Sequence, residues 1–248
     1  MAKARIYLVS CLLLVFIPSA CYAFSDSEVL ALQKKAHSLS RPDRIAFFAR
    51  KFIGTPYDKD PLGAYVRNAE IVHDSAVDCM YHVFRSTELA FSNTPQGARR
   101  EALYLRFKHM GRVDKAGKVL NYDDRFQYGE DMILSGKWGR DVTASLGKTE
   151  KMEGSRGIPF VNILPKSLIT GALPRFKDGD IVFFVKHPKQ RVVGEIIGHM
   201  GIIAVQDGTV YLVHAHGTKA RGGMVAKVPF GLYAKGMPFA GVMVTRFY

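Results

Sequence analysis

The sequence predicts an α+β fold, in which helices come first along the chain and an antiparallel sheet follows. Two observations support this prediction. Between residues 25 and 91 the apolar residues recur with a helical period. From Ile158 onward, short runs rich in β-branched and aromatic residues are separated by turn signals, which is typical of antiparallel strands. We expect a single domain over residues 24–248, with an insertion or lobe around 98–157.

The first 23 residues have the features of a secretory signal peptide. Lys3 and Arg5 form a basic start, and residues 6–17 form an apolar stretch that is too short to span a bilayer comfortably. Small residues then precede an expected cleavage position after Ala23. We therefore expect an exported protein, either periplasmic or secreted.

A lipid anchor is the alternative to a freely released product. Ser19-Ala20-Cys21 resembles the end of a lipoprotein signal, in which Cys21 would be acylated. Pro18 stands where such a signal normally carries Leu, so release is the favoured interpretation. No later stretch is long and apolar enough to predict a transmembrane helix.

The chain is strongly basic. Its formal charge is +13, and such an excess attracts polyanions. The basic residues are scattered apart from a denser run from Arg99 to Lys118, and they are not interleaved with aromatic residues that could stack on bases. We therefore expect no nucleic-acid partner, and anionic cell-wall polymers are the better candidates. Simple solubility is the other explanation.

Two short helices open the predicted domain. Ser25-Asp-Ser-Glu28 is a capping box for a helix that continues to Ala36. Ser40-Arg-Pro-Asp43 begins a second helix, with its proline in the first turn, and Gly54 ends it.

Cys79 stands out in the third predicted helix. The chain has three cysteines, and the other two, Cys11 and Cys21, lie in the predicted signal, so Cys79 has no disulfide partner after cleavage. Asp78 is placed as the N-cap of a helix that runs from Cys79 to about Phe91. A thiol in a first helical turn faces unpaired N–H groups and the positive end of the helix dipole, which both lower its pKa. Cys79 is therefore a nucleophile or a buried core residue, the commoner role of a cysteine.

The middle of the chain carries weaker signals. Residues 99–109 can form a helix or a strand, and their alternating apolar residues favour the strand. Residues 128–137 favour a short helix. Residues 147–157 are polar and predict a loop.

Five strands are expected after these segments, at residues 181–185, 199–205, 210–216, 225–228 and 240–248. Asp207-Gly208 forms a hairpin turn between the second and third of them. If these two residues alone form the turn, His199 faces His216, and His214 is a diagonal neighbour on the same face of the sheet.

Three histidines on one face suit two chemistries. One is a Cys–His pair whose histidine is oriented by a second polar group. The other is a His-X-His zinc site with a third ligand from the next strand, which leaves Cys79 unexplained unless it is a fourth ligand. Any one of these histidines can also be an ordinary hydrogen-bonded residue of the sheet.

Five motifs, in order over residues 45–248, resemble the NlpC-type papain-like cell-wall peptidases, and most closely the branch named N-acetylmuramoyl-L-alanine amidase-like. The motifs are Phe52-Ile-Gly-Thr-Pro-Tyr57, Val77-Asp-Cys79, Asp178-Gly-Asp-Ile-Val-Phe183, Gly198-His-Met-Gly-Ile202 and Leu212-Val-His-Ala215. The resemblance implies a papain-like fold with the nucleophile at the start of a core helix.

The resemblance also implies a role for each matching residue. Cys79 is then the nucleophile, His199 the base and His214 the third, orienting residue. Tyr57 and Asp78 line the substrate site beside the thiol. The reaction of this family needs no metal or other cofactor.

The sequence departs from the family pattern at two positions. Met80 follows Cys79 where many members have a Ser that helps to hold a free peptide amine. His216 stands where the family has the Ser of His-Ala-Ser. We place His216 among the substrate-binding residues, and whether His214 or His216 orients His199 stays open, as does the zinc site.

The expected function is that of an exported cysteine hydrolase that cleaves an amide bond in peptidoglycan or muropeptides. The bond between N-acetylmuramic acid and L-Ala is favoured, on resemblance alone. A D-Glu–diamino acid endopeptidase of the same mechanism is one alternative. A non-catalytic cell-wall-binding protein and a zinc hydrolase are the others.

Overall fold

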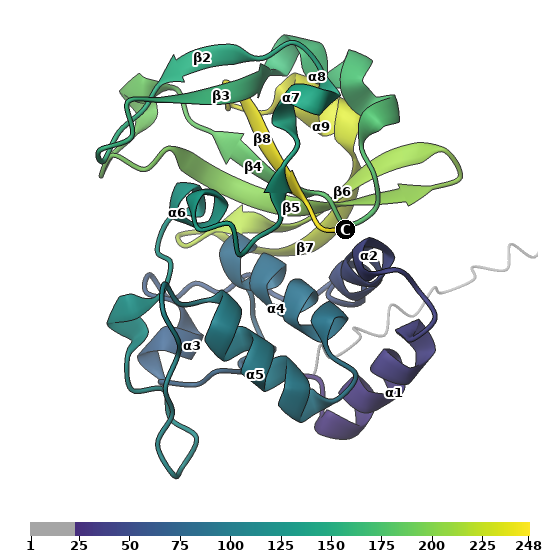
Figure 1. Cartoon of the computed structure of the whole chain (residues 1–248), viewed down its shortest axis with the longest axis vertical. Helices are drawn as coiled ribbons and strands as arrows, with labels where there is room; N and C mark the ends of the chain where they lie inside the picture. The colour runs from purple at the N-terminus through teal and green to yellow at the C-terminus, as the bar shows by residue number, and fades with distance from the viewer. Residues whose placement is uncertain (1–22) are drawn as a thin grey trace, which may run out of the picture.

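A computed structural model describes residues 23–248 of the chain. It shows a mixed α+β fold with an antiparallel sheet, as predicted (Figure 1). The predicted signal peptide, except Ala23, and the alternative lipid anchor at Cys21 lie outside the described residues. Within the described part, no helix combines the length and the hydropathy needed to cross a membrane.

Within residues 23–248, five helices precede the sheet. They are α1 (Asp26–Ala36), α2 (Arg41–Lys51), α3 (Ala64–Arg67), α4 (Cys79–Phe91) and α5 (Pro95–Leu105). The first two begin where the caps predicted: the Ser25 and Ser40 hydroxyls accept from the backbone N–H groups of Glu28 and Asp43. The predicted helix from Cys79 to Phe91 is also confirmed.

The strand predicted over residues 99–109 is wrong, because α5 occupies most of that segment. The Thr94 side chain caps this helix by accepting from the N–H of Gly97, and Pro95 lies in its first turn. Ala98, Ala102 and Leu105 are its buried positions, at helical spacing. The alternation that suggested a strand runs past the end of the helix into the following loop.

The later part of the chain forms the sheet and the short helices around it. The strands are β1 (Arg140–Asp141), β2 (Glu150–Glu153), β3 (Phe160–Pro165), β4 (Ile181–Val185), β5 (Ile197–Gln206), β6 (Thr209–Thr218), β7 (Gly222–Pro229) and β8 (Gly241–Arg246). The helices are α6 (Gly129–Leu134), α7 (Thr143–Leu146), α8 (Lys166–Ala172) and α9 (Phe230–Gly236). All five predicted strands are present.

The strands are antiparallel and follow the order β2-β3-β8-β4-β5-β6-β7, with β1 also paired to β8. The β5–β6 hairpin turns at Asp207-Gly208 with Gln206 opposite Thr209, which confirms the predicted register. The predicted loop at residues 147–157 is partly wrong, because β2 lies there. Its polar, largely exposed residues pair with β3 at the end of the sheet. Because neither face of β2 is buried, its sequence has no apolar alternation that would mark it as a strand.

The sheet separates two apolar cores (Figure 1). The helix-side core lies against the N-terminal helices, and the outer core lies against α7, α8 and α9. Alternate residues of β4 serve the two cores: Ile181, Phe183 and Val185 face the helix side, while Val182 and Phe184 face outward. All five are fully buried, so β4 is a central strand covered on both faces.

A buried charge network lies within the helical layer. Arg106 donates two hydrogen bonds to Glu88, at 2.5 and 2.7 Å, and both side chains are fully buried. Arg85 donates to Asp74, which also accepts from the Tyr81 hydroxyl at 2.9 Å. These contacts fix α4 against α5 and the loop that leads to Cys79.

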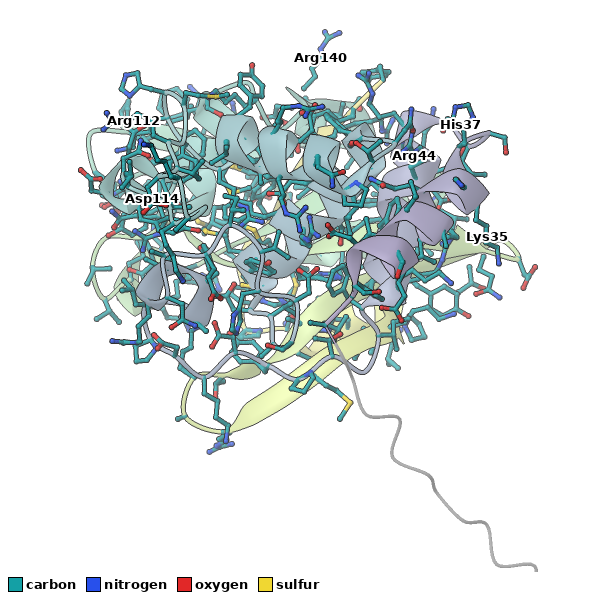
Figure 2. The ribbon with its side chains drawn as sticks, turned by 90° about the horizontal axis from the view of Figure 1, so that it is seen from below. Lys35, His37, Arg44, Arg112, Asp114 and Arg140 are labelled. Carbon is teal, nitrogen blue, oxygen red and sulfur yellow. The ribbon has the colours of Figure 1, made fainter. Side chains whose placement is uncertain are left out.

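The exposed basic residues are spread over the helical layer. Figure 2 views the molecule from below, with Lys35, His37 and Arg44 toward one end and Arg112 toward the other. The distribution agrees with the scattered charge seen in the sequence.

Candidate functional site

The Cys79 thiol lies at the start of α4, which packs on the sheet through β5. Asp78 caps this helix, because its Oδ1 accepts from the backbone N–H of Tyr81 at 2.8 Å. Cys79 is half-buried and is the free cysteine of the described residues. The predicted N-cap and the predicted place of the thiol in the first helical turn are both confirmed.

The predicted lowering of the Cys79 pKa is wrong. Burial, together with the negative charge of Asp78, raises the pKa of the Cys79 thiol to about 12. Hydrogen bonds from the backbone of Met200 and Met80 and the charge of Lys219 act in the opposite direction, without overcoming burial. The thiol therefore rests in its neutral form, because the loss of solvation outweighs the stabilisation that a helix start gives to a thiolate.

Two histidines contact each other across the β5–β6 pair. Nε2 of His199 lies 2.7 Å from Nδ1 of His214, which is hydrogen-bond distance. The paired residues of β5 and β6 run only as far as Ile202 and Val213, so the diagonal contact forms rather than the expected direct pair of His199 and His216. The His216 ring lies 5.3 Å from that of His214 and is exposed.

Burial keeps this histidine pair neutral. Together with the charge of nearby histidines, it lowers the pKa of His199 to about 3 and that of His214 to about 2. An aromatic shell accounts for the burial: Phe184 and Phe239 lie against His199, with ring centroids 5.4 and 6.3 Å away, and Tyr233 lies 4.9 Å from His214.

One arrangement of protons allows His199 to act as a base. If His199 carries its proton on Nε2, it donates to Nδ1 of His214, and its own Nδ1 is left free to accept a proton. His214 then carries its proton on Nε2, which is buried and has no hydrogen-bond partner within residues 23–248. In this arrangement the contact holds both the tautomer and the ring orientation of His199.

Among the described residues, the link between the thiol and the histidine pair is indirect and runs through Met200. The backbone of Met200 forms a hydrogen bond to the Cys79 sulfur, and Met200 directly follows His199 on β5. The side chains of His199, His214 and His216 line a cavity of about 610 Å³ together with Tyr233. Cys79, Tyr57 and Asp78 are not among its lining residues, but Tyr233 in the cavity wall lies close enough to Cys79 for a negative charge there to raise the Tyr233 pKa.

Tyr57 lies in an extended segment between the nucleophile and the sheet. Its backbone N–H donates to Gly223 on β7 at 2.9 Å, and it forms a parallel bridge with Val77, two residues before Cys79. Its ring packs against Gly217, where an added Cβ would come within 2.6 Å of a ring carbon. Burial and the nearby Cys79 and Asp78 raise the Tyr57 pKa above its usual value, so the phenol stays protonated beside the thiol.

Two cations of the β6–β7 turn were not found by sequence reasoning. The Lys219 ammonium lies 3.1 Å from Oδ2 of Asp78 and 3.0 Å from the backbone oxygen of Asp58. Arg221 lines the cavity, and its guanidinium makes no hydrogen bond or ion pair within the described residues. No local sequence pattern distinguishes a basic residue of a glycine-rich turn that lies near the site from one that does not. The positions of Lys219 and Arg221 are evident only in the folded structure, where segments far apart in sequence meet.

The geometry offers little to a metal ion. Among residues 23–248, no group of three or more His, Cys, Asp or Glu side chains is arranged to hold one. The nitrogens through which His199 and His214 meet point at each other and not at a shared third position.

Comparisons with known proteins place this fold beside two solved structures. An N-acetylmuramoyl-L-alanine amidase from Bacteroides uniformis is 24% identical, with 84% of this chain and 99% of that chain covered and a TM-score of 0.63. A Legionella pneumophila protein of family model DUF1460 is 16% identical, with 88% and 93% covered and a TM-score of 0.68. At these identities the likeness shows a shared fold. No protein-family model matches the sequence, and no curated protein matches it.

Proposed function

We propose that this protein is an exported cysteine hydrolase of papain-like fold that cleaves the amide bond between N-acetylmuramic acid and L-Ala in peptidoglycan or its fragments. The observation that carries the proposal is the His199–His214 hydrogen bond, next to the backbone that contacts the Cys79 thiol. The name of the Bacteroides uniformis neighbour supports the choice of bond. The predicted signal peptide would deliver the enzyme to the compartment of the cell wall.

The first step transfers a proton and forms a bond. His199 takes the thiol proton on Nδ1 as the Cys79 sulfur attacks the amide carbonyl, and the carbonyl electron pair moves onto oxygen. The backbone N–H of Cys79, at the open end of α4, donates to that oxyanion. Nδ1 of His214 accepts a hydrogen bond from the Nε2–H of the His199 imidazolium.

The second half releases both products. When the carbonyl forms again, the bond to the L-Ala nitrogen breaks, and His199 gives its proton to the leaving amine. Water then attacks the thioester, His199 accepts the proton of the water, and the thiol leaves with that proton. The site ends as it began, with a neutral thiol and a neutral imidazole, which is the state that burial favours.

The resting neutral pair shapes this mechanism. With the thiol pKa near 12 and that of His199 near 3, an ion pair is unfavourable before substrate arrives. Proton transfer and attack are therefore expected to occur together, with the new oxyanion compensating the charge on the imidazolium.

The cavity supplies places for the rest of the substrate. Tyr233 and Phe239 offer apolar surfaces in its wall, and His216 and Arg221 offer polar groups. We expect the unpaired Arg221 guanidinium to bind a carboxylate of the stem peptide, because Arg pairs readily with carboxylates.

Digestion of purified muropeptides tests the proposal. Wild-type protein should release free stem peptides that begin with L-Ala, identified by mass spectrometry, and Cys79→Ala should release none while its circular dichroism spectrum is unchanged. Cleavage by a folded Cys79→Ala protein would refute the thiol mechanism. If the products show cleavage only after D-Glu, the proposed bond is wrong and the proposed thiol mechanism still stands.

A further inference from the structure

The turn between β6 and β7 closes over the N-terminal end of α4. Lys219 in this turn contacts the Asp78 carboxylate at 3.1 Å and the Asp58 backbone oxygen at 3.0 Å. Its ammonium also lies 5.7 Å from the centre of the Tyr57 ring. The Lys219 ammonium therefore connects the β6–β7 turn to two segments near the thiol, the one that contains Tyr57 and Asp58 and the one that contains Asp78.

The contact uses the remaining oxygen of Asp78. Oδ1 accepts the capping N–H of Tyr81, and Oδ2 accepts from Lys219. The side chains of Asp78 and Lys219 are 19% and 32% exposed, so the pair is partly sheltered from water. The carboxylate beside the nucleophile is thus already paired with a cation of the protein itself.

The other acidic side chain near the thiol, Asp58, already accepts from the backbone N–H groups of Asp60 and Ala64. Met80 follows Cys79 and packs its thioether chain against the helix-side core. Tyr57 holds a protonated phenol. A substrate ammonium that approached this side of the thiol would have to displace Lys219 from Asp78, and a tethered cation has a high effective concentration at its partner.

We infer that Lys219 is a specificity-determining residue, whose ammonium fills the acidic position beside Cys79 so that the group on the acyl side of the scissile bond must carry no ammonium. This inference rests on the proposed function, and it narrows the substrate class. The muramyl group on the acyl side of an N-acetylmuramoyl-L-alanine bond has no ammonium. A stem peptide cut after D-Glu presents the free ammonium of L-Ala on the acyl side.

Binding to the Cys79→Ala protein tests the inference without turnover. The ligands are the tripeptide L-Ala-D-Glu-diamino acid, the same tripeptide N-acetylated on L-Ala, and the muramyl tripeptide, titrated by calorimetry. We expect each N-blocked ligand to bind about tenfold or more tightly than the free amine, because one like-charge contact is removed. Equal or tighter binding of the free tripeptide would overturn the inference. This comparison of ligands uses a protein in which Lys219 is unchanged.

Substitution of Lys219 supplies the second arm. In the Cys79→Ala background, Lys219→Gln should tighten binding of the free tripeptide and reduce the preference for blocked ligands by about tenfold, while Lys219→Arg should keep the preference. Lys227→Gln is the matched control, since Lys227 lies on β7 and contacts Gln206. An unchanged preference in folded Lys219→Gln would contradict the inference.

The two proposals fail in different ways. A wild-type protein that cleaves no muropeptide contradicts the proposed function, whatever the binding preference. A wild-type protein that cleaves muramyl peptides but binds free and blocked tripeptides equally contradicts only the role of Lys219.

Discussion

His199 and His214 share one hydrogen bond of 2.7 Å between adjacent strands, and each ring is enclosed by aromatic side chains. The contact is diagonal across the hairpin, so it depends on the register that the Asp207-Gly208 turn imposes. Because both histidines are kept neutral by burial, only one of the two facing nitrogens carries a proton. The tautomer of one ring therefore sets the tautomer of the other.

His214 and His216 should therefore differ in their effect on catalysis. His214→Ala should lower kcat by about 10²-fold or more, because His199 loses the acceptor that fixes its tautomer. His216→Ala should leave kcat within about threefold and act mainly on KM, since this residue lines the cavity without touching His199. Steady-state rates on muropeptides separate the two cases, and a larger loss of kcat in His216→Ala would reverse the assignment.

The Cys79 thiol should react slowly with alkylating reagents at neutral pH. Its raised pKa, near 12, makes the thiolate scarce, so the iodoacetamide rate of the free enzyme should rise about tenfold per pH unit from pH 8 to about pH 11. Asp78→Asn should move this profile to lower pH, because a negative charge next to the thiol is removed. A profile with its midpoint near pH 8 would contradict the burial of the thiol.

His82 should make the fold sensitive to acid. This residue is fully buried on α4, and burial lowers its pKa to about 4. Above pH 6.5 neither the folded nor the unfolded chain protonates it, and below that value only the unfolded chain does. Stability should therefore fall as the pH drops from 6.5 toward 4, by about 1.4 kcal/mol per unit from this one group.

The role of His82 is tested by how steeply the free energy of unfolding changes with pH, and not by its value at one pH. Urea unfolding of wild type and His82→Gln between pH 7 and pH 5 should show a slope that is smaller by about one proton in the variant. Parallel curves, displaced by a constant amount, would mean that His82 acts only through packing.

The buried pair of Arg106 and Glu88 should be costly to break on one side. Glu88→Gln should destabilise the protein by about 3–5 kcal/mol, because a fully buried guanidinium loses its counter-charge. The double change Glu88→Leu with Arg106→Met should recover much of that loss, since no buried charge remains. Urea unfolding measures both, and a double variant no more stable than Glu88→Gln would contradict this account.

Arg221 should act on substrate binding and not on the chemical step. Arg221→Gln should raise KM for stem-peptide substrates by about tenfold with kcat nearly unchanged, and the salt dependence of KM should weaken. Arg140→Gln is the control, because Arg140 is exposed on β1 (Figure 2) and is not among the residues that line the cavity. A fall in kcat with unchanged KM would place Arg221 elsewhere in the mechanism.

The elements that carry the candidate site were largely predictable, because their signals are local. Asp78 marks a helix start by its own side chain, and Asp207-Gly208 sets the parity of every residue in the hairpin. The contact of Lys219 with Asp78 joins positions 141 residues apart, and no local pattern reports it. The direction of the Cys79 pKa was wrong for a similar reason, since burial is set by what packs around the thiol.

The two-sided burial of β4 has a consequence for the order in which the molecule forms and opens. Each core takes alternate side chains from this one strand, so neither core is complete until β4 has paired with both β5 and β8. Local fluctuations that loosen a helix layer leave the opposite face of β4 packed. Its backbone amides should therefore exchange with solvent hydrogen only in whole-molecule unfolding, at the slowest rate in the chain.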